Sequence, residues 1–314
     1  MKSQKVRILQ DVLGQPKKEG SELLFKCPKC NHPKKKLSIN LDRDVWKCWI
    51  CGYSGHKLRR VVRKWGTNLN VQEWNEETSD PIPSNFEEYF HDYFNTETEE
   101  VHVSIPEEFT SLTRIGKYDL EAIKAYNYLK ERGLTREDIL RWKIGFCPTG
   151  DYEGRIIIPS FRSDGRCNYF IARSYTGHYR KYKNPKAKKE EIVFNELYVD
   201  WSKDLILTEG AFDAIVAGNS VPLLGSSLNK KSKLFHAIVV HDTPIYIALD
   251  FDAENLAWRM IKDLLSYDVE VFKIDTSGYE DVACMPREVF LDRKESAQEV
   301  DRNSIFLREL ELII

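Results

Sequence analysis

A regular alternation of short apolar runs and helical periods fills the last third of the chain. The apolar runs lie at 205–208, 221–224, 245–249 and 269–274, and segments with apolar residues every three or four positions lie at 212–217, 234–240 and 254–265. This order is typical of a parallel sheet that is covered by helices. Because ligands of such sheets bind beyond the carboxyl ends of the strands, the residues after each run are the first candidates for a site.

The middle of the chain has a less regular pattern, which predicts a mixed α and β region. Residues 119–133 have the apolar spacing of a helix, and Thr135 with Asp138 has the spacing of a capping box at the start of a second, shorter helix. Short apolar runs follow at 156–159 and 169–172, and these runs predict two strands.

Near the N-terminus, four cysteines stand in two close pairs. The pairs are Cys27 with Cys30 and Cys48 with Cys51, each of the form C-x2-C, and 17 residues separate them. This is the spacing of a four-thiolate structural zinc site. The spacer alternates apolar and polar residues, as a small hairpin does, so we predict a zinc ribbon. The alternative is that the cysteines pack as small apolar residues.

Charge is segregated along the 314 residues, although the formal net charge is only -2. Residues 1–66 hold 17 Lys and Arg against five acidic residues, and residues 155–190 hold ten against two. Between these basic stretches, residues 67–113 hold 12 acidic residues and no Lys or Arg. Two basic modules that flank an acidic linker favour a polyanion such as nucleic acid as partner, although a charged stretch can also be only a solvated surface.

Acidic residues follow three of the four predicted strands. They are Glu209 after the first strand, Asp250 and Asp252 after the third, and Asp275 and Asp281 after the fourth. Carboxylates that converge on one sheet edge are suited to Mg2+ or Mn2+, which phosphoryl transfer uses. Asp252 could instead be only the N-cap of the helix that follows it.

Several motifs resemble those of the DnaG-type DNA primases of bacteria and phages, which carry a zinc ribbon and a TOPRIM catalytic domain. Residues 209–213 are similar to the family's E-G-x-x-D, 224–228 to L-G-T-x-L, 250–252 to D-x-D, 128–134 with 144–146 to Y-L-x-x-R-G-L and I-G-F, and 181–185 to its K-Y-x-N segment. One motif departs from the family: residues 280–283 keep only the first aspartate of K-D-P-D, which makes Asp281 a less secure metal ligand than Asp250.

The resemblance implies a multidomain fold, in which a small β zinc ribbon precedes an α/β polymerase core with a TOPRIM subdomain built on a Rossmann-like, mainly parallel sheet. We expect a zinc-ribbon DNA-binding domain at 1–66, an acidic linker at 67–113, a basic mixed α/β subdomain at 114–196 and the TOPRIM catalytic subdomain with a C-terminal helical segment at 197–314.

The resemblance also implies the activity of a DNA primase, which makes short RNA primers on single-stranded DNA. Its partners would be the single-stranded DNA template, ribonucleoside triphosphates, the RNA primer and a separate replicative helicase, because the chain has no P-loop motif of its own. One structural Zn2+ and catalytic Mg2+ or Mn2+ would be its cofactors. The absence of a long apolar run and of a signal peptide predicts a cytoplasmic protein, in the host cytoplasm if a phage encodes it.

Each candidate site residue receives a role from this resemblance. Glu209, Asp250 and Asp252 would be catalytic and, with Asp281 or Asp275, would hold the divalent metal, while Asp213 would support them. Nucleotide or nucleic-acid contacts would come from Arg155, Arg173, Lys181 and Lys183 in the core and from Trp46, Trp49 and Arg59 in the ribbon.

Two other classes of function remain open on the sequence alone. One is a non-catalytic DNA-binding or recombination-mediator protein, because zinc modules and TOPRIM folds also occur together in such proteins. The other is a TOPRIM nuclease. The products made from single-stranded DNA and ribonucleotides would separate the three.

Overall fold

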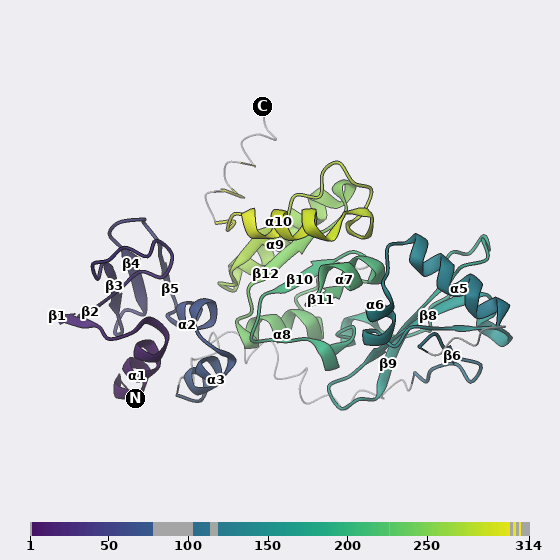
Figure 1. Ribbon diagram of the computed structural model, residues 1–314, viewed down its shortest axis with the longest axis horizontal. Coiled ribbons are helices and arrows are strands. Elements are labelled where there is room, and N and C mark those ends of the chain that lie inside the picture. Colours follow the sequence, from purple (N-terminus) through teal and green to yellow (C-terminus); the bar gives the residue numbers. More distant parts are fainter. Residues whose placement is uncertain are drawn as a thin grey trace. The chain divides into compact units, whose positions relative to one another are not determined.

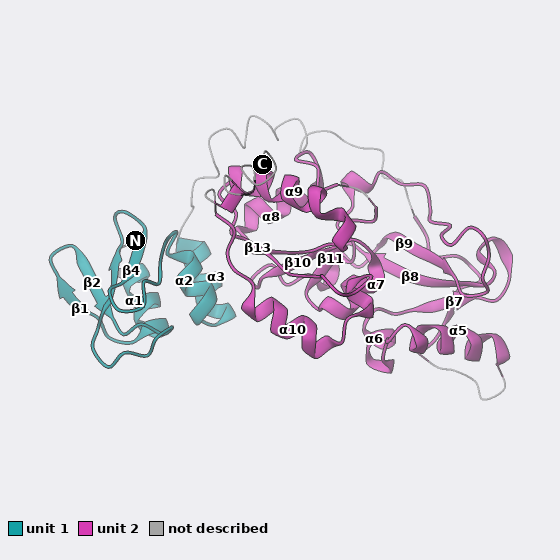
Figure 2. Cartoon of the chain, turned by 90° about the horizontal axis from the view of Figure 1, so that it is seen from above, with its two compact units in different colours: residues 1–87 teal, residues 88–314 magenta. Residues whose placement is uncertain are grey.

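The chain divides into two units, residues 1–87 and 88–314 (Figure 2). Each unit has its own apolar core. The structure is a computed structural model that describes residues 2–77, 103–113, 119–225, 227–301, 304, 305 and 308. Within these residues, no helix is long and apolar enough to cross a membrane.

The predicted hairpin lies at the centre of a five-stranded antiparallel sheet in the first unit, with its strands in sequence order (Figure 1). The strands are β1 (Lys17–Glu19), β2 (Glu22–Phe25), β3 (Leu37–Asn40), β4 (Val45–Cys48) and β5 (Ser54–His56). Ile39 lies opposite Trp46 across β3 and β4, and Leu37 lies opposite Cys48. All four side chains are buried, so one face of the sheet forms the core of the ribbon.

Among its described residues, the first unit also has three helices, which the sequence patterns did not predict. They are α1 (Lys2–Leu13), α2 (Arg59–Trp65) and α3 (Asn68–Glu77). Ile8 of α1, Val61 of α2 and Trp74 of α3 belong to the same core as Leu37 of the sheet. The helices therefore supply apolar area that a ribbon of this size lacks by itself.

The acidic linker expected at 67–113 is shorter at both ends in the structure. Helix α3 occupies its start, where Val71 and Trp74 are buried and Glu73 pairs with Arg7 of α1 at 2.9 Å. At the other end, Thr110 and Ser111 form a strand of the second unit. The net charge of this segment does not reveal these elements, because the acidic side chains of α3 lie on its solvent side while two apolar side chains point into the core. Residues 78–102 lie outside the described residues.

An antiparallel sheet with the order β6-β7-β8-β9 opens the second unit. Its strands are β6 (Thr110–Ser111), β7 (Gly145–Cys147), β8 (Arg155–Phe161) and β9 (Cys167–Ser174), and its helices are α5 (Leu120–Glu131) and α6 (Arg136–Arg141). The predicted capping box is confirmed, because the backbone N–H of Asp138 donates to Thr135 Oγ1 at 3.2 Å and that of Thr135 donates to Asp138 Oδ2 at 2.8 Å. The middle of the chain is thus mixed α and β.

The alternating pattern of the last third forms a four-stranded parallel sheet with the order β11-β10-β12-β13. The strands are β10 (Leu205–Thr208), β11 (Ser220–Pro222), β12 (Ile245–Ala248) and β13 (Val271–Lys273), and the helices are α7 (Ala211–Ala217), α8 (Lys233–His241), α9 (Glu254–Ser266) and α10 (Arg287–Ser296). The predicted fold class is confirmed, including every predicted strand and helix of this region.

Both faces of the parallel sheet are covered. Leu205 and Leu207 of β10 share a core with Phe235 of α8 and Met260 of α9, whereas Ile206 shares a different core with Phe290 of α10. Because side chains alternate along a strand, these two cores lie on opposite faces. This packing leaves the ends of the strands as the open edge of the sheet.

An ion pair ties α10 to α6, elements far apart in the sequence. Arg287 donates to Asp138 Oδ2 at 2.5 Å, and the Asp138 side chain is 8% exposed. Burial by itself would raise the pKa of this carboxyl, but hydrogen bonds from Arg287 and Thr135 outweigh it and hold the pKa below its ordinary value. The pair therefore stabilises the fold in the pH range where Asp138 is ionised.

Replacing Arg287 with methionine should lower the free energy of unfolding by about 1–3 kcal/mol near neutral pH, because it leaves a buried carboxylate without its charged partner. A carboxyl whose pKa is depressed by folding stabilises above its unfolded pKa, so the deficit should shrink as the pH falls through the folded pKa of Asp138. Urea unfolding at a series of acidic pH values measures this difference in the free energy of unfolding between wild type and variant. Arg141→Met, at an exposed arginine of α6, should change the free energy by less than about 0.5 kcal/mol; an equal loss in both variants would contradict the assignment.

Trp74→Ala should destabilise the first unit by about 3–5 kcal/mol, since it empties a site where the side chain is 1% exposed. Trp49→Ala is the matched control, because Trp49 is 66% exposed and its loss should be close to neutral. Thermal or urea unfolding monitored by circular dichroism gives both values. Similar stabilities for the two variants would mean that α3 is not part of the core.

Candidate functional site

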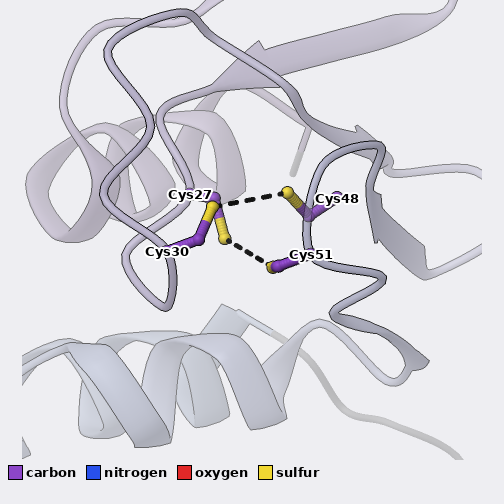
Figure 3. A group of neighbouring side chains, drawn as sticks. All are labelled: Cys27, Cys30, Cys48 and Cys51. Atoms are coloured by element: carbon purple, nitrogen blue, oxygen red, sulfur yellow. Dashed lines mark hydrogen bonds between the residues drawn. The ribbon is translucent and has the colours of Figure 1, made fainter.

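The four predicted zinc ligands meet at one point of the ribbon (Figure 3). Cys27 and Cys30 lie in the loop between β2 and β3, Cys48 ends β4, and Cys51 lies in the turn to β5. Cys27 Sγ lies 3.8 Å from Cys51 Sγ, Cys30 Sγ lies 3.9 Å from Cys48 Sγ, and the four sulfurs lie within 4.8 Å of one another.

These distances fit a zinc ion and do not fit disulfides. Tetrahedral zinc with Zn–S bonds of about 2.3 Å places its sulfur ligands about 3.8 Å apart. A disulfide would bring two sulfurs to about 2.05 Å. The donor set of four thiolates is also the set that selects zinc among common divalent ions.

Backbone N–H groups are directed at the sulfurs. Burial raises the pKa of Cys48, but the N–H groups of Cys51 and Ile50 outweigh it and lower the pKa to about 7. At Cys27 the effect of burial is the larger one and raises the pKa to about 12, although the N–H groups of Cys30 and Lys29 act to lower it. Turns with N–H groups aimed at thiolates are suited to a metal ion, which supplies the positive charge that buried thiolates need.

Three carboxylates converge at the carboxyl edge of the parallel sheet. Glu209 follows β10 directly, Asp250 comes two residues after β12, and Asp252 lies in the short 3-10 helix Phe251–Ala253. One oxygen of each of these side chains lies within 4.8 Å of the others. The sheet register explains this, because Thr208 and Ala248 are partners in the parallel pair β10 and β12.

The electrostatics of this cluster favour a bound cation. Burial, followed by the charges of Asp213, Glu209 and Asp281, raises the pKa of Asp250 to about 7. Burial and Asp252 likewise raise the pKa of Glu209. The buried Oδ1 of Asp250 has no hydrogen-bond partner among the described residues. A divalent cation would give this oxygen a partner and relieve the repulsion, so the residues fit one.

Asp213, predicted to support the cluster, accepts two backbone N–H groups. Its Oδ2 accepts the N–H of Gly210 and its Oδ1 accepts the N–H of Ala283, both at 3.0 Å. Because it is buried, its pKa is raised to about 6 despite these bonds. Asp213 therefore fixes the loop around 281–284 against the start of α7.

Asp281 and Asp275 differ in their relation to the cluster. Asp281 accepts the N–H of Cys284 at 2.7 Å, and its charge still raises the pKa of Asp250 and Asp213. Asp275 accepts the N–H of Ser277 at 2.9 Å, and hydrogen bonds from Ser277 lower its pKa. Asp281 thus lies beside the three carboxylates, although it is outside their closest group, and Asp275 caps its own turn.

The four cations predicted to contact nucleic acid differ in exposure: one is buried, one is partly buried and two are exposed. Arg155 is 5% exposed, and its guanidinium donates to the carbonyls of Arg180 at 3.0 Å and Lys181 at 3.4 Å. Backbone carbonyls thus accept from both terminal nitrogens of this buried guanidinium, and its expected role in phosphate binding stays a prediction. Lys181 is exposed, and Lys183 donates to the carbonyl of Asp151 at 2.5 Å while its side chain remains 45% exposed.

Arg173 belongs to a chain of arginine and aromatic side chains that the sequence patterns did not predict. The Nε groups of Arg173 and Arg132 both donate to Tyr128 Oη at 3.0 Å. Arg132 also lies 5.1 Å from the ring of Phe212, next to Asp213 in α7. Tyr128 and Arg132 are four residues apart, which is the spacing of neighbouring side chains on a helix, so the sequence does contain a signal for this pair. Two guanidinium groups thus converge close to the helix that carries Asp213.

In the ribbon, the structure separates Trp49 from the other two predicted contact residues. Trp46 is 6% exposed and packs on Tyr53, and Arg59 is 7% exposed and donates to Asn75 Oδ1 at 2.6 Å. Both side chains are part of the interior, and their expected nucleic-acid contacts stay predictions. Trp49 is 66% exposed, and Lys47 Nζ lies 4.7 Å from its ring.

Cys48→Ser should release the metal from the ribbon, because serine cannot replace a thiolate ligand of zinc. Plasma mass spectrometry should find about one zinc per wild-type chain and a loss of most of it in the variant, together with a lower thermal stability of the first unit. Cys167→Ser, at a cysteine far from the cluster in sequence, is the control and should keep its zinc. Full zinc content in the Cys48 variant would contradict the site.

Comparisons with known proteins find similarity in sequence and in fold. No family model matches the chain. A DNA primase of Thermotoga maritima is 22% identical in an alignment of length 319 that covers 86% of this chain and 54% of that protein. A DNA primase of Mycoplasma genitalium is 23% identical in an alignment of length 305 that covers 78% of this chain and 50% of that protein. The chain thus spans about half the length of these curated relatives.

A solved structure of the DnaG primase catalytic domain bound to single-stranded DNA has the same fold. It aligns with a TM-score of 0.54 and 19% identity, over 63% of this chain and 78% of that one. The predicted resemblance is therefore confirmed: the chain is similar in sequence to bacterial DNA primases, and over much of its length it has the fold of the DnaG primase catalytic domain.

Proposed function

We propose that this chain is a DNA primase, an enzyme that makes short RNA primers on a single-stranded DNA template in a divalent-metal-dependent nucleotidyl transfer. The observation that carries the proposal is the cluster of Glu209, Asp250 and Asp252 at the carboxyl edge of a primase-like parallel sheet. The names of the similar proteins support it.

Asp250 and Asp252 would hold Mg2+ or Mn2+, with Asp281 beside them. The bound ion would neutralise the phosphates of the incoming ribonucleotide. Glu209 would complete the ligand set or accept the proton of the attacking 3′-hydroxyl, and its raised pKa suits a proton acceptor. Asp213 would hold the loop that carries Asp281 and would not itself touch the substrate.

Cations near the carboxylates would hold the polyanionic substrates. Arg173 and Arg132 each donate to the neutral phenol of Tyr128, a contact that does not neutralise the positive charge with which a guanidinium binds phosphate. Lys181 and Lys183 add exposed ammonium groups on the next segment. These residues would bind the template backbone or the triphosphates.

The ribbon would contact the template through its exposed aromatic residue. Trp49 offers a free ring face beside Lys47, which is the combination that unpaired bases and their phosphates favour. Ribonucleoside triphosphates, the growing RNA primer and a separate replicative helicase would be the other partners.

Asp250→Asn should lower primer synthesis roughly 100-fold or more, because it removes the charge that holds the cation at the reacting phosphate. Full-length protein, single-stranded DNA, four ribonucleotides and Mg2+ are incubated, and labelled RNA is resolved on a denaturing gel. Asp292→Asn, at an exposed aspartate of α10, is the matched control and should act as wild type.

The products decide between the proposal and its alternatives. Short RNA that depends on Asp250 supports the primase, whereas Mg2+-dependent cleavage of the DNA would identify a TOPRIM nuclease. Binding of single-stranded DNA without synthesis or cleavage would indicate a DNA-binding or recombination-mediator protein. Wild-type synthesis by the Asp250 variant would show that the carboxylate cluster is not the catalytic centre.

A further inference from the structure

A hairpin beyond β9 carries an aromatic side chain into solvent. The backbone N–H of Ser174 donates to the carbonyl of Lys181 at 2.9 Å, and that of Lys183 donates to Ala172 at 3.0 Å. Residues 172–183 thus fold back on themselves. At the tip, Tyr179 is 81% exposed, the largest exposed fraction of any large apolar or aromatic side chain among the described residues.

The tip is held from inside by hydrogen bonds. Arg155, buried below it, donates to the carbonyls of Arg180 and Lys181. The N–H of His178 donates to Ser174 Oγ at 3.1 Å, and the N–H of Arg180 donates to His178 Nδ1 at 3.1 Å. The exposed ring therefore belongs to an ordered turn, so a ligand that stacks on it does not have to order the backbone first.

The surroundings of Tyr179 are cationic and aromatic. The ring of His178 stacks on it with a centroid distance of 4.5 Å and an interplanar angle of 29°. The guanidinium of Arg180 lies 5.7 Å from its centroid. Residues 178–189 contain six Lys and Arg and no acidic residue. An exposed ring within such positive charge matches a ligand that has both flat faces and regular negative charge.

Single-stranded DNA has both properties. Its unpaired bases can stack on tyrosine, and its phosphates can pair with arginine and lysine. In a duplex the base faces are already stacked on one another, so the same turn would offer only its charge. A polyanion without flat groups, such as an acidic polypeptide, would likewise use only the charge.

Contacts join this hairpin to helix α7, which carries Asp213. Arg173, at the base of the hairpin, lies 4.7 Å from the ring of Tyr182 and donates to Tyr128. Tyr128 in turn accepts from Arg132, which packs on Phe212 of α7. A strand whose phosphates follow these arginines would therefore extend between the hairpin and the carboxylates.

We propose that the tip of this hairpin is a base-stacking platform for single-stranded DNA, on which Tyr179 stacks an unpaired base and Arg180 contacts a phosphate. The identity of the ligand rests on the proposed primase function. The platform adds a contact outside the catalytic cluster that distinguishes single strands from duplex.

Binding of fluorescein-labelled dT16 to the full-length chain, followed by fluorescence anisotropy, tests the platform. Tyr179→Ala should raise the dissociation constant roughly 5- to 150-fold, the range for loss of one stacked base, without changing its salt dependence. Tyr179→Trp should bind as tightly as wild type or more tightly. Arg180→Met should weaken binding and reduce the salt dependence, because one phosphate contact is lost.

Tyr198→Ala is the matched control, since Tyr198 is an exposed tyrosine with a lysine 5.9 Å from its ring, outside this hairpin. It should bind dT16 as wild type does. Unchanged binding by Tyr179→Ala would overturn the platform, and so would an equal loss for a 16-base-pair duplex. Tighter binding of polyglutamate than of dT16 by the wild type would show that the surface takes an acidic polypeptide.

The same variants separate this inference from the proposed function. If the wild type makes primers and Tyr179→Ala binds dT16 and primes equally well, the platform fails and the primase stands. If the wild type makes no primers but binds dT16 through Tyr179, the platform stands and the primase fails. Thermal unfolding of each variant confirms that the change at the exposed tip leaves the fold intact.

Discussion

Repulsion among clustered, partly buried carboxylates is the constraint around which the second unit is organised. The parallel register that pairs Thr208 with Ala248 sends Glu209 and Asp250 out of the sheet at one edge. Their burial and proximity raise the pKa of Asp250 to about 7. Two backbone N–H groups hold Asp213 next to them, and guanidinium groups converge near α7. In this arrangement a divalent cation has a stabilising role, because it allows the carboxylates to remain charged at close distance.

Features set by residues close in sequence could be predicted from the pattern alone. The parallel sheet followed from the spacing of apolar runs, the start of α6 from Thr135 and Asp138, and the metal cluster of the ribbon from two C-x2-C pairs. In each case the physical cause acts within a few residues or repeats with a fixed period. The convergence of Glu209 with Asp250 was also accessible, because parallel strands share their carboxyl edge.

Features set by tertiary packing could not be predicted in the same way. Arg155 and Lys181 look alike in a basic stretch, yet only the fold shows that backbone carbonyls occupy the guanidinium of Arg155. Trp46 and Trp49 are three residues apart, and the sheet buries one and exposes the other. The acidic composition of α3 concealed Trp74, whose burial depends on α1 and α2. Composition describes the average of a segment, whereas function depends on the direction of single side chains.

The bond between Asp213 and the N–H of Ala283 has a consequence for how the third acidic motif can vary. Because the donor is a backbone group, the identity of side chain 283 does not enter the contact, and alanine can stand where related chains have aspartate. Proline at position 283 would remove the contact, because it has no N–H to donate. At this position the contact is therefore permissive for the side chain and strict for the backbone, so divergence at 283 is compatible with an unchanged arrangement of the carboxylates.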